Sequence, residues 1–264
     1  MIRRVCLAVA IWAVSAPAQW LNHPTPGIPR TAGGKPNLSA PAPRTRDRKP
    51  DLTGLWQRVR GPNQRLNAGL AMGPNLEDFM RPGEKIPPML PAAAALYQQR
   101  QANFMADRPS ARCLPHGIPD QMLIRVPMKI VQDPGLTLIL YEEFARFRQI
   151  FTDGRELPKD PNPTWFGYSV GKWEGDDWVV NTIGIKESTW LDNAGRPHSD
   201  ALHLIERFQR HDFGHMDILL TIDDPKAYTK PWTVKEDLRL IPDTELLEYI
   251  CVENEKDYGH LVGK

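Results

Sequence analysis

The feature that most constrains the fold is a series of short strand-like segments that fills the chain from residue 122 onward. Apolar and polar residues alternate within them, and clusters rich in Asp, Pro and Gly separate them, as at positions 133–135 and 174–177. Such alternation is typical of strands with one buried face. The predicted strands cover residues 122–131, 136–142, 144–152, 165–173, 178–184, 201–210, 216–222, 232–240 and 245–252. An earlier strand over 51–59, anchored by Trp56, makes nine or ten in all.

These strands follow one another without intervening helices, so a parallel sheet is not expected. An antiparallel meander closes into a barrel or folds into a sandwich, because free strand edges favour aggregation. The residues Gly54-Leu-Trp56 resemble the Gly-x-Trp opening of lipocalin-type barrels, which favours the barrel. We therefore expect an all-β, lipocalin-like barrel that holds one small ligand. One covering helix is predicted over residues 92–105, which Pro91 introduces and Pro109 follows.

The N-terminal region predicts export. Residues 1–18 read as a signal peptide, with Arg3 and Arg4, an apolar run over 5–14 and an Ala-Pro-Ala cleavage site at 16–18. The arginine pair also loosely resembles a twin-arginine signal. Residues 19–50 are rich in Pro and polar residues and are expected to be an extended or disordered lead-in, and residues 51–264 form a single barrel domain. The expected location is the periplasm or the extracellular space.

Cysteine usage and charge agree with this location. Two thiols, Cys113 and Cys251, remain after the signal peptide, and in an oxidising compartment such a pair is usually a disulfide. Two independent buried thiols are the alternative. Without Arg3 and Arg4 the formal net charge changes from +1 to −1, which argues against nucleic acid or an anionic membrane as partner. The rest of the sequence contains no apolar run long enough for a membrane span.

Several longer motifs also point to export. They begin at Pro50 (Pro-Asp-Leu-Thr-Gly-Leu-Trp), Arg112 (Arg-Cys-Leu-Pro-His-Gly), Trp173 (Trp-Glu-Gly-Asp-Asp-Trp-Val-Val), Trp190 (Trp-Leu-Asp-Asn-Ala-Gly-Arg-Pro-His-Ser) and Asp223 (Asp-Asp-Pro-Lys-Ala-Tyr-Thr-Lys-Pro-Trp). Together they resemble a widespread group of secreted bacterial proteins, common in acidobacterial and proteobacterial genomes. The resemblance covers nearly the whole mature chain and implies a bacterial exported protein. It carries over no activity and no catalytic residues.

The segment 196–211 gives the best indication of a site. In a strand, His203 and Arg207 share one face and Glu206 lies on the other, so either register turns a charge inward. An unpaired buried charge costs several kcal/mol, so the charge must be paired or face a wet cavity. The functional interpretation is an acid–base site in which His198 or His203 is the base, Glu206 orients it and Tyr168 donates a proton. The alternative is a loop histidine and a Glu–Arg ion pair that joins two strands.

Four arginines are candidates for holding an anionic group of a substrate, because a guanidinium forms paired hydrogen bonds with carboxylates and phosphates. They are Arg146, Arg148, Arg155 and Arg207. Equally, they could face solvent or pair with glutamates. Trp165 and Trp173 could stack on a sugar or an aromatic ring, or simply fill a core. His116 is a further binding candidate. A zinc site would use His198 and His203, with His116 or Glu206 as the third ligand. That spacing matches no ligand motif, so neither a metal nor an organic cofactor is expected.

The sequence contains no Gly-x-Ser-x-Gly elbow, phosphate-binding glycine loop, dinucleotide fingerprint or His-Glu-x-x-His motif. This disfavours hydrolases, kinases and dehydrogenases. The expected function is an exported barrel that acts on a small molecule, as a lyase or isomerase without a cofactor. The alternatives are a non-catalytic periplasmic protein that binds a small ligand and a structural envelope module with an apolar interior.

Overall fold

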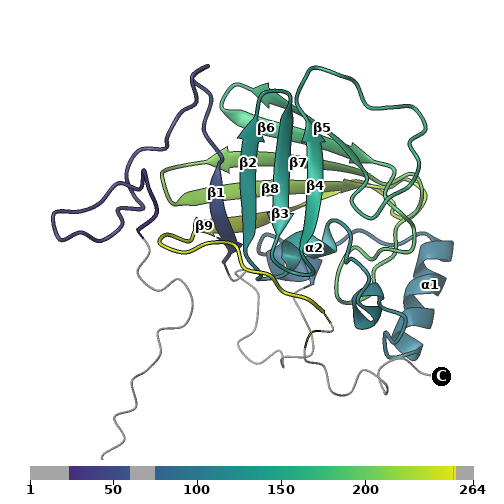
Figure 1. The fold of residues 1–264 in the computed structure, drawn as a ribbon. Coiled ribbons are helices and arrows are strands. Elements are labelled where there is room, and N and C mark those ends of the chain that lie inside the picture. Colours follow the sequence, from purple (N-terminus) through teal and green to yellow (C-terminus); the bar gives the residue numbers. More distant parts are fainter. Residues whose placement is uncertain (1–23, 60–74, 252, 254–264) are drawn as a thin grey trace, which may run out of the picture.

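A computed structural model describes residues 24–59, 75–251 and 253, so the predicted signal peptide lies outside the described part. Nine strands close into one barrel in chain order (Figure 1). The strands are β1 (Gly54–Arg58), β2 (Met128–Asp133), β3 (Leu136–Tyr141), β4 (Arg146–Phe151), β5 (Tyr168–Glu174), β6 (Asp177–Ile183), β7 (His203–Arg210), β8 (His215–Asp223) and β9 (Trp232–Leu240). The predicted all-β barrel is confirmed. Its helical segments are η1 (Leu76–Phe79), α1 (Pro91–Ala102), η2 (Pro109–Arg112) and α2 (Asp120–Leu123).

The prediction of a wholly antiparallel meander is wrong at one pair of strands. β4 and β5 are parallel, and their register joins only Ile150 to Ser169 and Phe151 to Val170. Residues 152–167 cause this, because they carry the chain back to the end of the barrel at which β4 began. All other neighbouring strands are antiparallel.

Two predicted strand segments are also corrected. Residues 120–123 form helix α2, whose Met122 and Leu123 enter the core. The segment predicted as a last strand over 245–252 forms a single isolated bridge, between Tyr249 and Glu143, within its described residues. The physical reason is that β1 already pairs with β9, so the closed barrel leaves no free edge for another strand.

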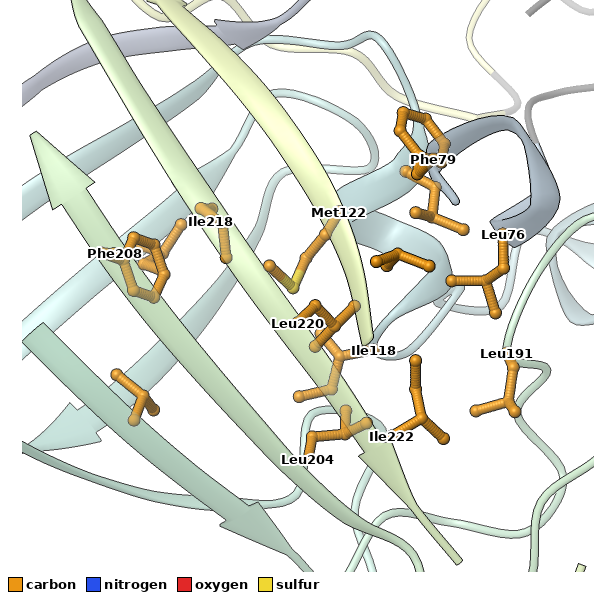
Figure 2. Packing of buried hydrophobic residues seen from close by; sticks show 14 of the residues in the cluster. Leu76, Phe79, Ile118, Met122, Leu191, Leu204, Phe208, Ile218, Leu220 and Ile222 are labelled. Atoms are coloured by element: carbon orange, nitrogen blue, oxygen red, sulfur yellow. The ribbon is translucent and has the colours of Figure 1, made fainter. Parts of the chain in front are cut away.

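Alternating residues of each strand fill the barrel. The burial of β7 and β8 alternates strictly, and Leu204, Phe208, Ile218 and Leu220 point inward (Figure 2). At one end, η1 adds Leu76 and Phe79 to this cluster, α2 adds Met122, and Ile118 joins it from the segment just before α2 (Figure 2). The core therefore continues from the barrel into the helical segments that close its end.

The opposite end is covered by the N-terminal lead-in. The amide of Phe213 donates to Ala40 O (2.8 Å) and the amide of Gly214 to Leu38 O (2.7 Å). The described part of the lead-in contains no helix or strand, and it turns back on itself at two antiparallel bridges, from Arg30 to Pro36 and from Arg44 to Pro50. Helix α1 packs on a loop rather than on a strand: Arg100 lies over the ring of Trp190 at 4.8 Å and donates to Gly195 O.

A disulfide between Cys113 and Cys251 ties the end of the chain to the helical segments, as the sequence predicts. It spans 138 residues, and in the chain-entropy model closing such a loop stabilises the fold by about 5 kcal/mol. An ion pair between Lys129 and Glu245 (2.8 Å) holds the same C-terminal segment against β2. Among the described residues, no helix combines the length and apolar character that crossing a bilayer requires.

Candidate functional site

The inward charge predicted for segment 196–211 is Glu206, and its partner is Arg148 of β4. The two side chains are 0% and 1% exposed. Arg148 donates to both carboxylate oxygens of Glu206, at 2.9 Å from Nη1 and at closer range from Nη2. Its remaining N–H groups reach the hydroxyls of Ser169 and Thr182. The ion pair is therefore complete, which matches the alternative interpretation of Glu206 as part of a pair that joins strands.

The charge state of this pair follows from its surroundings. Burial disfavours the charged form of Arg148, but the charge of Glu206 and its hydrogen bonds outweigh burial and raise the pKa. Arg148 is therefore a cation near neutral pH. A buried pair of this kind tolerates no loss of one partner, because the other would be left as an uncompensated charge.

A second interior carboxyl, Glu236 of β9, was not identified from the sequence. It is fully buried, and neither of its oxygens has a hydrogen-bond partner among the described residues. Burial raises its pKa to about 8, Arg58 opposes this shift and Glu206 adds to it. Tyr141 of β3 lies near the same charges, and burial raises its pKa to about 12. The signal was present in the sequence, because Glu236 occupies an inward position between Val234 and Leu238.

The structure does not form the predicted acid–base pair between His203 and Glu206. His203 lies on the outer face of β7, where its Nε2 is 2.9 Å from Asn181 Oδ1. Burial lowers its pKa, with Asp223 opposing the shift, so the ring is neutral near pH 7. The separation follows directly from strand geometry, because positions three apart point to opposite faces.

His198 lies in the buried loop between β6 and β7. Its Nε2 is 2.7 Å from Thr189 Oγ1 and its Nδ1 is 3.0 Å from Ser199 O, so both ring nitrogens are engaged by the protein. Burial lowers its pKa, which keeps the ring neutral. This arrangement suits a histidine that holds a loop together more than one that exchanges protons with a substrate.

His116 is enclosed by carboxylates. Its Nδ1 is 2.7 Å from Asp120 and its Nε2 is 3.3 Å from Glu143. Burial lowers the pKa of the ring, but hydrogen bonds and charges from both carboxylates outweigh it and raise the pKa to about 9. The imidazolium is therefore an internal cation. No cluster of His, Cys, Asp or Glu within the described ranges has the arrangement of a metal site.

The other predicted site residues lie on the surface or in separate contacts. Arg155 donates to Tyr168 Oη (3.1 Å) and lies over the ring of Phe151, at an exposed position. Arg207 pairs with Asp177 and Glu174 on the outer face. Arg146 is exposed. The ring of Trp165 lies 5.4 Å from Lys186 Nζ.

Trp173 lines a hollow of about 660 Å³, which we call the seam cleft. It opens where β5 continues past the last residue of β4, because the two strands pair only over two positions. Its walls are the lead-in, the turns after β2 and β4, and the last part of β5, with the lining residues Thr45, Arg46, Asp47, Gln132, Asp133, Pro134, Gly135, Thr152, Gly154, Gly171, Lys172, Trp173 and Trp178.

Two indoles define the apolar part of the seam cleft. The half-buried ring of Trp173 lies 6.5 Å from that of the fully buried Trp178. Trp178 Nε1 is buried without a hydrogen-bond partner among the described residues. A Cβ atom at Gly171 would lie 2.9 Å from this nitrogen, so the indole packs closely against the glycine and a larger residue there would clash with it. The cleft thus offers the half-buried ring of Trp173 as a stacking surface, with Trp178 packed beside it.

Comparisons with known proteins add no assignment: no protein-family model matches the chain, and the search of curated proteins finds no match.

Proposed function

We propose that this protein is an exported, non-catalytic barrel that binds a small, uncharged, ring-bearing molecule in the seam cleft. The observation that carries the proposal is the half-buried ring of Trp173, which lines the cleft next to the buried indole of Trp178. Export is supported by the sequence of residues 1–18 and by the disulfide.

The size and chemistry of the cleft favour such a ligand. About 660 Å³ lies within the range of small-molecule sites, which are mostly apolar with a few placed polar groups. The ring of Trp173 offers a stacking face, and polar side chains of the lining such as Gln132 and Thr152 offer hydrogen bonds to a ligand. The charged residues of the lining are two cations, Arg46 and Lys172, and two carboxylates, Asp47 and Asp133. This balance favours a neutral polar ring, such as a sugar or a hydroxylated aromatic.

Binding without turnover is favoured because the acid–base residues lie elsewhere. His198, His203 and Glu206 do not line the seam cleft, and the partners of each are already supplied by the protein. A lyase or isomerase needs a titrating group beside the reacting atom. The lining offers only Asp47 and Asp133 as possible proton acceptors.

The test is isothermal titration of the protein with glucose, cellobiose, catechol and adenosine, followed by recovery of each compound. We expect at least one to bind and to be recovered intact. Trp173→Ala should weaken that binding about tenfold, because about 1.4 kcal/mol of stacking and burial is lost. Trp165→Ala is the matched control, since its half-buried ring lies outside the cleft. Equal effects of the two variants, no binding by any compound, or chemical conversion of a bound compound would contradict the proposal.

A further inference from the structure

A second hollow of about 660 Å³ lies on the outer face of β7, β8 and β9, and we call it the outer groove. Its floor is formed by outward-facing side chains of the three strands, and its walls by the segment after η1 and the residues that precede β9. The lining residues are Met80, Arg81, Glu84, Lys85, Ile205, Arg207, Leu219, Thr221, Lys230, Pro231, Trp232, Thr233, Val234 and Lys235.

The outer groove is strongly cationic. Five of its lining residues are Lys or Arg and one, Glu84, is a carboxylate, although the whole chain is close to neutral. Arg207 and Lys235 already pair with carboxylates on the same sheet face. In contrast, Arg81, Lys85 and Lys230 form no ion pair with any described residue. The groove therefore holds three positive charges that no carboxylate among the described residues pairs with.

The floor of the outer groove is partly apolar. Ile205 of β7 and Leu219 of β8 are half-buried side chains of this floor, and Leu219 lies directly opposite Arg207 and Lys235 on its two neighbouring strands. Trp232 lines the groove where β9 begins, and its Nε1 is buried without a hydrogen-bond partner in the part of the chain that is described. An apolar surface with cations around it provides contacts for both parts of an amphipathic anion.

We propose that the outer groove is a binding site for a small amphipathic organic anion, a carboxylate or phosphate ester with an apolar part. The apolar part packs on Ile205 and Leu219. The anionic group is held by Arg81, Lys85 and Lys230, whose charges also attract it over distance. The site is independent of the seam cleft, since the two share no lining residue.

Octanoate and octyl phosphate are suitable probes, because each joins an apolar chain to an anionic group. Octan-1-ol, which has the chain without the charge, and inorganic phosphate, which has the charge without the chain, are the controls. By isothermal titration at 50 mM salt, we expect the two amphipathic anions to bind at least tenfold more tightly than either separate part. Raising the salt to 500 mM should weaken their binding, because exposed charges are then screened. Comparable binding by octan-1-ol, or by inorganic phosphate, would overturn the proposal.

The double variant Lys85→Gln/Lys230→Gln tests the cations. We expect it to weaken octanoate binding at least tenfold, whereas Lys35→Gln/Lys159→Gln, which removes the same charge at exposed positions outside the groove, changes it less than twofold. Leu219→Glu tests the floor and should abolish binding, with the melting midpoint verifying the fold. Trp173→Ala should leave octanoate binding unchanged. Equal behaviour of the two double variants, or loss of octanoate binding in Trp173→Ala, would contradict a separate anion site.

Discussion

The two sides of this barrel are joined in different ways. β7 pairs with β8 without interruption from His203 to Arg210, and β8 pairs with β9 over a similar length. β4, by contrast, meets β5 only at Ile150 and Phe151. A continuous antiparallel ladder satisfies every backbone group along its length, whereas a two-position parallel contact leaves most of β5 without a neighbour on that side.

The ion pair between Arg148 and Glu206 compensates for the short contact between β4 and β5, which we call the seam. Arg148 extends from β4 and donates to Ser169 of β5, Thr182 of β6 and Glu206 of β7. One side chain thus links four strands across the position at which the backbone ladder is weakest. The comparison suggests that buried charge on the seam side does the structural task that backbone pairing does on the other side.

The largest expected effect is that of Arg148→Met. It removes the link and leaves Glu206 as an uncompensated buried charge, so the free energy of unfolding should fall by about 3–5 kcal/mol in urea denaturation. The double variant Arg148→Met/Glu206→Leu should recover most of this loss, since neither charge of the pair remains. If the single variant loses less than 1 kcal/mol, the seam does not depend on the pair.

A smaller effect concerns Glu236, whose pKa is about 8 in the folded protein and near 4.5 when unfolded. Between these values the folded state holds a proton that the unfolded state has released, so stability falls as pH rises through that window and is constant above it. Between pH 5 and pH 6.5, below the titration window of His116, Glu236→Gln should reduce this fall by about 1–2 kcal/mol in urea denaturation. An unchanged pH profile would show that Glu236 is ionised or hydrated when folded.

Thr182→Val should cost about 1–2 kcal/mol, because it withdraws one acceptor from the buried guanidinium of Arg148 while preserving shape. Thr221→Val on β8 is the matched control, since its hydroxyl pairs with Thr233 on the outer face. We expect thermal melts to separate the two variants. Equal losses of stability in the two variants would contradict a special role for the hydrogen bonds of Arg148 at the contact of β4 with β5.

The smallest effect is expected for Arg207→Gln, which breaks outer-face pairs with Asp177 and Glu174. Exposed pairs contribute about 0.2–1 kcal/mol, and the effect should diminish at high salt. A loss as large as that of Arg148→Met would mean that the two faces of the sheet carry comparable electrostatic stabilisation.

Much of the strand pattern was predictable, because the alternation in segments such as 203–210 is local. It predicted that either register turns a charged residue inward, which is Glu206 in the register that the structure adopts, and that this charge requires a partner or a wet cavity. It could not identify the partner, since Arg148 lies 58 positions away on a strand that is not adjacent to β7. The same alternation placed His203 on the opposite face from Glu206, so the proposed pairing of these two residues conflicted with the geometry of their own strand.

The sequence by itself determined that the strands alternate between a buried and an exposed face, the approximate extent of most of them, and the two cysteines available for a disulfide. All of these depend on local periodicity or on composition. The tertiary structure alone decided the parallel contact of β4 with β5, the partner of Glu206, and the two hollows, one lined by Trp173 and the other by Lys85 and Lys230. These depend on how the ends of the sheet meet when the barrel closes, and closure joins residues whose separation along the chain carries no local signal.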